Sequence, residues 1–349
     1  MMKQIAIVLV SLLGLVATAA RAEVLLQGAG ATFPNPLYQR WTSEYRKQHP
    51  EVKIDYQSIG SGGGIKGITD KTIDFAGSDA PMSKKEMAAA GGQIVHIPTV
   101  AGAVVPAFNL QGVGELNLSG PVLADIYTGK ITKWNDPKIA ELNDGRQLPD
   151  VAITPVWRTD GSGTTFVFTN YLATQSEEFK NSVGMGKQVK WPLGQGGKGS
   201  EGVAAAVQQT PGAIGYVEAN YASANKIPFA AVKNHAGKFV KASPQSVSAA
   251  GEGAIAKMDK SLAVDIWNQP GDAAYPISAF TYIIVYKDLG YLKDQNKAKA
   301  LVDFLKWATN EGQSYAGEMD YAPLSDGVKK KVADAIESLQ WQGQAVAEK

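Results

Sequence analysis

The sequence predicts an α/β fold with two domains. Short segments of alternating apolar residues, typical of β-strands, are followed by turns of small residues and then by apolar residues at helical spacing. Neither a repeat of about 20 to 50 residues nor a low-complexity tract is visible. The 349 residues are enough for two domains of roughly 100 to 200 residues, each with its own core.

The first 22 residues predict a secretory signal peptide. Lys3 precedes an apolar run over residues 5–20, and the letters ARA at 20–22 form a small-residue cleavage site. A membrane anchor is the alternative, but a spanning helix needs about 20 apolar residues and this run is shorter. Removing 22 of 349 residues leaves 327, and we expect this mature chain to begin near Glu23 in the periplasm.

Charge and cysteine content exclude several kinds of partner. Lys3 and Arg21 leave with the signal peptide, so 32 of the 34 basic residues remain against 33 acidic ones. This balance predicts neither nucleic-acid binding nor attraction to an anionic membrane. The sequence has no cysteine, so it forms no disulfide and offers no cysteine for a lipid anchor. We therefore expect a protein that is free in the periplasm.

The first part of the mature chain contains three strand-turn-helix units, whose predicted strands lie at 24–27, 52–56 and 73–75. The first turn places Thr32 and Phe33 at the start of a helix. The second combines the hydroxyl of Ser61 with glycines that let the backbone approach a ligand closely. The third places Asp79 just past a strand's carboxyl end, where open α/β sheets bind ligands.

The remaining segments continue the alternation of strands and helices. An apolar run at 94–108, interrupted by Pro98 and Pro106, predicts paired strands that cross from one domain to the other. Residues 225–275 show no clear pattern. The other predicted elements are a helix at 122–127, a loop at 130–150, strands at 151–157, 213–217 and 281–286, helices at 166–172, 295–309 and 326–339, and a glycine-rich loop at 194–199.

A fourth turn, RTDGSGTT, joins a predicted strand to a predicted helix and combines a guanidinium with small hydroxyl residues. Arg158 can bind a tetrahedral oxyanion bidentately, and Ser162, Gly163 and Thr164 lie at the positive end of the following helix. The alternative for Arg158 is a surface salt bridge with Asp160. Both can hold if Asp160 orients the guanidinium from behind.

Any one of these turns is explained as a helix cap. Together, Thr32 and Phe33, Ser61, and the Ser162 turn predict an anion site. Asp79 limits which anions can bind. An ionised carboxylate only accepts hydrogen bonds, so it favours an anion that carries a proton. Phosphate carries one or two protons near neutral pH, whereas sulfate carries none.

Features of phosphate-processing enzymes and metal hydrolases are missing. Lys198 is followed by glycine, where a P-loop needs serine or threonine. Metal hydrolysis needs clustered ligands, but His49, His96 and His235 are far apart, and we expect each at the surface or in a loop. Binding without a metal or cofactor is therefore favoured over catalysis.

Four motifs in order carry a resemblance to a known family: GAGATFP at 28–34, IGSGG at 59–63, DFAGSDAP at 74–81 and DGSGT at 160–164. Further matches are IYTGKI at 126–131, KWP at 190–192 and PGAIGYVE at 211–218. The chain resembles the periplasmic phosphate-binding proteins of Pst-type ABC transporters over essentially the whole mature sequence. It departs from them at Gly62, where a second serine is common, and at Trp157, where a second arginine can occur.

The resemblance implies a two-lobed type II periplasmic binding protein, each lobe a mixed sheet flanked by helices, with phosphate in the cleft between the lobes. One lobe would comprise 23–103 plus 277–349, and the other 104–276. The implied phosphate ligands are Thr32, Phe33, Ser61 and Asp79 from the first lobe and Arg158, Ser162, Gly163 and Thr164 from the second, with Asp160 behind Arg158.

The implied function is capture of inorganic phosphate by a monomer and its delivery to an inner-membrane ABC permease, with no cofactor. Two alternatives stay open. An exported phosphatase would use the same pocket for a phosphoester, and an adhesin or matrix protein would use the same fold for a surface role.

Overall fold

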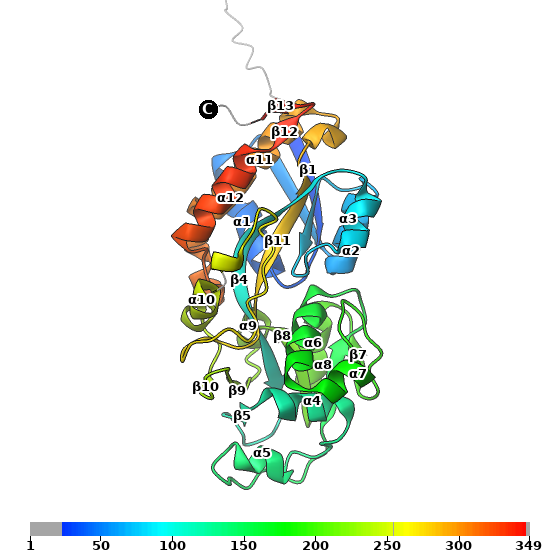
Figure 1. Ribbon diagram of the computed structural model, residues 1–349, viewed down its shortest axis with the longest axis vertical. Coiled ribbons are helices and arrows are strands. Elements are labelled where there is room, and N and C mark those ends of the chain that lie inside the picture. The colour runs from blue at the N-terminus through cyan, green and yellow to red at the C-terminus, as the bar shows by residue number, and fades with distance from the viewer. Residues whose placement is uncertain (1–22, 254, 347–349) are drawn as a thin grey trace, which may run out of the picture.

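Eight strands form one continuous sheet in the order β2-β1-β3-β11-β4-β8-β6-β7, and helices flank it along its length (Figure 1). The computed structural model describes residues 23–253 and 255–346, so the predicted signal peptide lies outside it. The strands are β1 (Val24–Gly30), β2 (Val52–Ser58), β3 (Phe75–Ser78), β4 (Ile94–Phe108), β6 (Thr154–Arg158), β7 (Gln195–Gly197), β8 (Ala213–Glu218) and β11 (Ser278–Tyr286). The predicted α/β fold is confirmed.

The described residues contain twelve α-helices, and most of them lie where the sequence predicts a helix, apart from those at 137–141, 177–182, 219–224 and 244–252. They are α1 (Asn35–Gln48), α2 (Ser61–Thr69), α3 (Lys84–Ala90), α4 (Gly120–Thr128), α5 (Pro137–Glu141), α6 (Gly163–Gln175), α7 (Glu177–Ser182), α8 (Gly199–Gln209), α9 (Ala219–Ala224), α10 (Pro244–Glu252), α11 (Gln295–Thr309) and α12 (Asp326–Glu337). Small strands complete the fold: β5 (Asn117–Leu118), β9 (Ala231–Lys233) and β10 (Phe239–Val240) form one sheet, and β12 (Gln340–Trp341) pairs with β13 (Gln344–Ala345).

The sheet has two halves, and each contains parallel strands with an antiparallel neighbour. We call the part around β1, β2 and β3 the first half, and the part around β6, β7 and β8 the second half. Strand β4 belongs to both, because it pairs with β11 as far as Ala103 and with β8 from Val104 onward. This change of partner supports the predicted boundary near residue 103, although the lobe ranges stay a prediction.

The expectation of paired strands at 94–108 is wrong, because this segment is one strand of 15 residues. Pro98 does not break it, since the pairing with β11 shifts register there: Thr281 lies opposite Val100, whereas Tyr282 lies opposite Pro98. Thr99 is therefore the extra residue of a β-bulge, a place in a sheet where proline is tolerated.

Three other expectations need correction. The glycine-rich loop at 194–199 contains the edge strand β7, which pairs with β6. The loop at 130–150 contains α5, capped by Asp136. His96, expected at the surface or in a loop, is buried on β4, where its Nε2 accepts a hydrogen bond from the Met82 amide; burial lowers the pKa of His96 to about 4.

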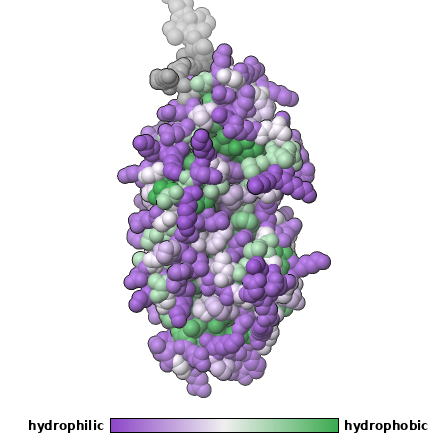
Figure 2. Space-filling model, viewed as in Figure 1, coloured by the Kyte–Doolittle hydropathy of each residue, from purple (hydrophilic) through white to green (hydrophobic). Residues whose placement is uncertain are grey.

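Both halves of the protein have aromatic residues in their cores. In the first half Trp41 packs on Tyr38 and donates to the Gly312 carbonyl oxygen at 2.7 Å. In the second half Phe168 stacks on Tyr216 with 4.4 Å between ring centroids. Outside, the face in Figure 2 shows apolar residues in small patches among hydrophilic ones.

The amphipathic helix α11 offers a test of the core. Leu301 is fully buried, so Leu301→Ala should lower the free energy of unfolding by about 2 to 5 kcal/mol. Chemical denaturation measures the change. Lys299→Ala, on the exposed face of the same helix, serves as the control and should change it by at most about 0.5 kcal/mol. Equal effects of the two variants would contradict the assigned face.

Candidate functional site

The predicted turns meet where the two halves of the sheet face each other. Thr32 follows β1, Ser61 begins α2, Asp79 follows β3, and Arg158 ends β6. Hydrogen bonds join the halves at this point. Among them, the Gly163 amide donates to the Ser61 hydroxyl oxygen at 3.1 Å, and the Thr164 hydroxyl donates to Asp79 Oδ2 at 3.5 Å. All eight predicted site residues are buried, and no polar residue among them is more than 3% exposed.

Further contacts cross between the halves around this cluster, so the protein is closed over it. The Gly62 amide donates to the Gly161 carbonyl oxygen at 2.7 Å, and Lys187 pairs with Glu86 at 2.5 Å. Gly163 is required for this closeness, because a Cβ there would lie 2.5 Å from the Ser61 hydroxyl oxygen and 2.6 Å from Asp79 Oδ2.

The chain approaches the cluster through special backbone geometry at Gly60, whose φ of 84° suits glycine. This residue turns the chain from β2 directly into α2. In the second half Ser162 caps α6, where its hydroxyl oxygen accepts from the Thr165 amide at 3.0 Å. The predicted role of Ser162 as a ligand is thus combined with a capping role, and its hydroxyl proton stays available for donation.

Several backbone donors at the cluster have no protein acceptor. Within residues 23–253 and 255–346, the amide N–H groups of Thr32, Phe33 and Thr164 make no hydrogen bond. Buried N–H groups in folded proteins are nearly always paired, so these three donors indicate an acceptor that the protein itself does not supply. An oxyanion provides acceptors in all directions.

Tyrosines hold the Thr32 turn in place from behind. The hydroxyl of Tyr221 donates to the Thr32 carbonyl oxygen, and that of Tyr321 donates to the Phe33 carbonyl oxygen, both at 2.6 Å. With their carbonyl oxygens fixed in this way, Thr32 and Phe33 keep a single backbone orientation. The Phe33 side chain itself is fully buried, so only its backbone can meet a ligand.

Arg158 and Asp160 form a bidentate ion pair that is largely buried and does not lie at the surface. This agrees with the interpretation in which Asp160 orients the guanidinium from behind. Nε and Nη2 of Arg158 donate to the two Asp160 carboxylate oxygens at 2.8 and 2.5 Å. Burial opposes ionisation of Asp160, but its bonds to Arg158 outweigh this and lower the pKa of Asp160. Nη1 of Arg158 remains on the cluster side, 3.4 Å from the Thr164 and Ser200 hydroxyl oxygens.

Asp79 is the second charged group of the cluster. Burial raises the pKa of Asp79 to about 7, although hydrogen bonds from Thr281 and Thr164 and the charge of Arg158 act in the opposite direction. Near neutral pH the site can therefore hold either the acceptor-only carboxylate or the protonated acid. The protonation of Asp79 decides whether the cluster offers an acceptor or a donor at this position.

Sequence reasoning missed two residues that complete the cluster. Ser200, in the first turn of α8, lies with its hydroxyl oxygen 2.7 Å from that of Thr32, and its amide donates to the same Thr32 oxygen at 3.2 Å. Its position directly after the glycine-rich loop predicted at 194–199 was the available signal. Thr281 donates to Asp79 Oδ1 at 2.9 Å from the middle of β11, where no local pattern marks it.

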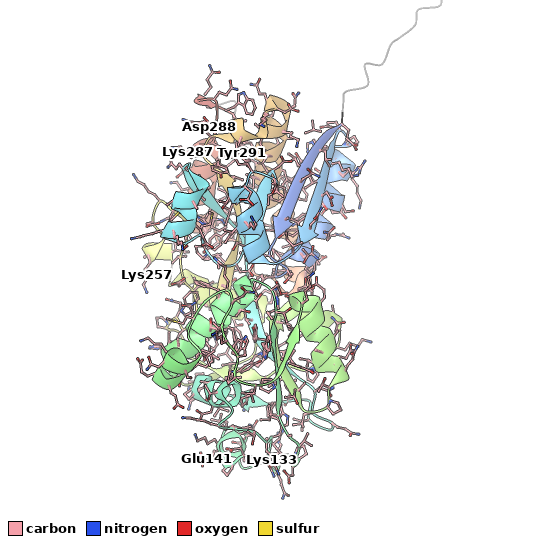
Figure 3. All side chains as sticks on the ribbon, turned by 90° about the vertical axis from the view of Figure 1, so that its right-hand side faces the viewer. Lys133, Glu141, Lys257, Lys287, Asp288 and Tyr291 are labelled. Atoms are coloured by element: carbon pink, nitrogen blue, oxygen red, sulfur yellow. The ribbon has the colours of Figure 1, made fainter. Side chains whose placement is uncertain are left out.

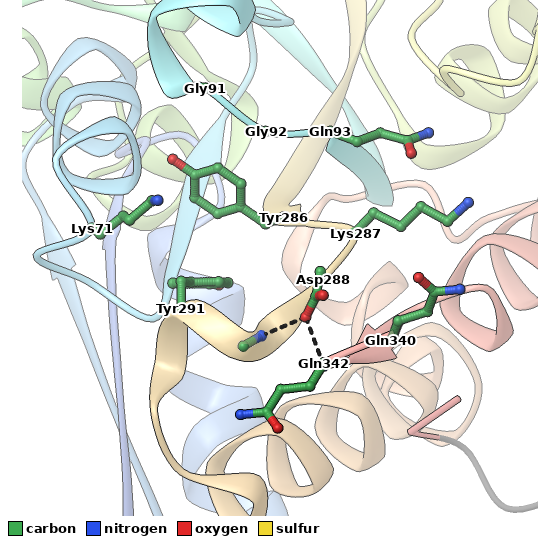
Figure 4. A pocket seen from close by; sticks show the side chains of 11 residues that line it. Lys71, Gly91, Gly92, Gln93, Tyr286, Lys287, Asp288, Tyr291, Gln340 and Gln342 are labelled. Carbon is green, nitrogen blue, oxygen red and sulfur yellow. Dashed lines mark hydrogen bonds between the residues drawn. The ribbon is translucent and has the colours of Figure 1, made fainter. Parts of the chain in front are cut away.

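A surface pocket away from this cluster differs from it in chemistry. Figure 4 shows a surface pocket of about 360 Å³ in the first half, lined by Tyr286 and Tyr291 with Lys71 nearby. Its carboxylate, Asp288, already accepts hydrogen bonds from the Gly290 and Gln342 amides. In Figure 3 this region lies at the end of the molecule opposite Lys133 and Glu141, away from the junction of the halves.

Metal and membrane chemistry find no support in the described ranges. No group of three or more histidine or acidic side chains there could hold a metal ion. Nor does any helix among those residues combine the length and apolar character needed to cross a bilayer.

The fold of the chain, with the cluster at the junction of its halves, is that of a PBP superfamily protein. A family model described as a PBP superfamily domain matches residues 17–311. Solved structures share the fold: a phosphate-binding protein from Stenotrophomonas maltophilia matches with a TM-score of 0.70 at 21% identity, covering 89% of this chain and 94% of its own. A high-affinity periplasmic phosphate-binding protein solved with phosphate matches with a TM-score of 0.70 at 23% identity, covering 88% and 93%.

Sequence relatives narrow the class. The phosphate-binding protein PstS of Pasteurella multocida is 47% identical over 91% of this chain and 90% of its own length. PstS of Methanocaldococcus jannaschii is 40% identical over 84% of this chain and 80% of its own. The chain belongs to the PstS family of phosphate-binding proteins, as its motifs predicted.

The raised pKa of Asp79 predicts a cost in stability. The folded protein binds a proton at Asp79 more tightly than the unfolded chain does, so this residue's contribution to stability falls as the pH rises from about 4 to about 7. Asp79→Asn should therefore raise the free energy of unfolding of the ligand-free protein at pH 8, by on the order of 3 kcal/mol. The gain should vanish near pH 4.

Denaturant titrations of both proteins at several pH values measure this difference. Asp55→Asn, an exposed position on β2, provides the control and should show little change. A difference between wild type and Asp79→Asn that does not vary with pH would contradict the assignment.

Proposed function

We propose that this protein binds inorganic phosphate between its two halves and delivers it to an ABC-type importer. The observation that carries the proposal is the set of unpaired amide donors at Thr32, Phe33 and Thr164, gathered beside Arg158 and Asp79. Neutral amides and hydroxyls with one arginine suit a tetrahedral oxyanion. Relatives named as phosphate-binding proteins support phosphate as that anion.

In this proposal the ligands are divided between the halves. Thr32, Phe33, Ser61 and Asp79 come from the first half, and Arg158 with the Ser162 turn comes from the second. A ligand that binds both sets stabilises the closed arrangement, since its hydrogen bonds replace contacts that the halves lose on opening. Strand β4 and the segment that enters β11 at Ser278 pass between the halves, and they would bend to allow this motion (Figure 1).

In this proposal, Asp79 is the residue that selects phosphate over sulfate. An ionised carboxylate attracts a ligand oxygen only through a proton on that oxygen, so it accepts from phosphate and repels sulfate. The Arg158 charge is largely matched by Asp160, so it does not cancel this repulsion. Asp79 thus converts a general oxyanion site into one for protonated oxyanions.

The wider biological role follows from the same proposal. The protein is exported through residues 1–22, acts as a monomer in the periplasm without a lipid anchor, and meets an inner-membrane permease complex. It binds its ligand without converting it and needs no cofactor. Membership of the PstS family and the predicted signal peptide support these parts of the proposal.

Titration calorimetry on protein freed of bound anion tests the function. At pH 8, where Asp79 is ionised, we expect phosphate to bind and a large excess of sulfate not to compete. At pH 5.5, below the pKa of Asp79 of about 7, the protonated acid can donate, so sulfate should begin to compete. Equal binding of both anions at pH 8 would sink the proposal, as would turnover of a phosphomonoester by the metal-free protein.

Asp79→Asn should weaken the preference rather than abolish binding. The amide keeps the shape of the side chain but can both donate and accept, so we expect phosphate affinity at pH 8 to fall roughly ten- to hundredfold and sulfate to gain. The pH dependence of the sulfate competition should disappear as well. Competition titrations measure both changes, with Asp55→Asn as control, and an unchanged ratio of affinities would contradict the role of Asp79.

A further inference from the structure

We propose that Thr281 positions Asp79 so that a single carboxylate oxygen, Oδ2, meets the ligand, and that it thereby fixes how many ligand protons the site accepts. The inference rests on the proposed phosphate site. Thr281 lies on β11, far in sequence from every predicted ligand, and its side chain is fully buried.

The two oxygens of Asp79 have different surroundings. Oδ1 accepts the Thr281 hydroxyl at 2.9 Å, whereas Oδ2 lies toward the Thr164 hydroxyl, at 3.5 Å, and toward Gly163. Because a threonine hydroxyl has one proton and an ionised carboxylate only accepts, Thr281 must donate to ionised Asp79. Oδ1 is then engaged by the protein, and Oδ2 is the oxygen that faces the α6 turn of the proposed site.

A β-bulge fixes the Thr281 backbone. Thr99, the extra residue of the bulge, donates its hydroxyl to the Thr281 carbonyl oxygen at 3.2 Å. Its own carbonyl oxygen accepts from the Gln313 side chain at 2.9 Å. Bulges commonly occur beside functional sites, where they direct a side chain. Because the hydroxyl and the carbonyl oxygen of Thr99 are engaged in this way, the bulge holds the Thr281 hydroxyl against Asp79.

The hydrogen-bond directions behind Thr281 are also determined. The hydroxyl oxygens of Tyr38 and Thr99 lie 2.7 Å apart. Since the Thr99 proton is used on the Thr281 carbonyl oxygen, Tyr38 must be the donor to Thr99. All three side chains are at most 2% exposed, so water does not compete for these bonds. The row Tyr38, Thr99 and Thr281 leads from α1 to Asp79.

Thr281 also favours the ionised form of Asp79, since its donated bond lowers the pKa that burial raises. Arg158 on β6 is the charged group that acts in the same direction, and Thr164 on α6 adds a weaker hydrogen bond. The titratable neighbours on the other elements are tyrosines whose own pKa is raised by burial, so they stay neutral: Tyr38 on α1, Tyr56 on β2, Tyr282 on β11, and Tyr321.

Thr281→Val tests the inference, because it replaces the hydroxyl by a methyl group of similar size. At pH 8 we expect phosphate affinity to fall roughly ten- to hundredfold, the loss typical of a hydrogen bond to a charged group. Protonated Asp79 no longer accepts the proton of the ligand through Oδ2, so phosphate affinity should fall toward acid. In Thr281→Val this fall should begin at a higher pH than in wild type, and sulfate should compete at that higher pH too. Thr281→Ser keeps the hydroxyl and should restore both profiles.

A double-mutant cycle separates positioning from packing. If Thr281 acts through Asp79, Thr281→Val should have almost no further effect in an Asp79→Asn protein. Thr281→Ala is measured in parallel, so that poor packing of valine does not decide the result. An affinity loss that is uniform over pH, or that persists in the Asp79→Asn background, would overturn the inference.

The proposed function and this inference fail in different ways. If wild type binds phosphate and rejects sulfate while Thr281→Val and Thr281→Ala match it at every pH, the proposed function stands and the role of Thr281 is refuted. If wild type does not bind phosphate, both are refuted.

Discussion

Burial of Asp79 is the constraint on which the site depends. A carboxylate taken out of water is costly in its charged form unless hydrogen bonds and a positive charge compensate it. Thr281 and Thr164 supply the hydrogen bonds and Arg158 the charge, but together they leave the pKa of Asp79 raised to about 7. In the proposed site, the protein thus holds a poorly stabilised charge where a ligand proton would stabilise it, so that stability is lost in exchange for selectivity.

The positive charge of Arg158 is likewise largely compensated within the protein. Asp160 engages two of its three nitrogens, and the Gly199 amide further supports that carboxylate at 3.0 Å. The guanidinium is therefore rigid and nearly neutralised, and it acts through the direction of Nη1 more than through net charge. In the proposed site, amide donors and helix termini would supply the remaining attraction for an anion.

Local patterns predicted most of the elements and most residues of the cluster at the junction of the halves. The strand-turn-helix units placed Thr32, Ser61, Asp79 and Arg158 correctly at the ends of strands, because small residues and helix caps have strong local preferences. The errors arose where partners far along the chain decide. Residues 94–108 form one strand because β11 and β8 pair with successive parts of it, and β7 forms because β6 offers it an edge.

The sequence by itself determined the motifs, the signal peptide prediction and the kind of anion that Asp79 favours, because these depend on side-chain chemistry and on neighbours within a few residues. Only the tertiary structure decided that Ser200 contacts Thr32 and that Thr281 contacts Asp79, pairs separated by 168 and 202 positions. A threonine in mid-strand carries no local sign of its partner. The strand order and the bulge at Thr99 set the direction of its hydroxyl, and both follow from packing of the whole chain.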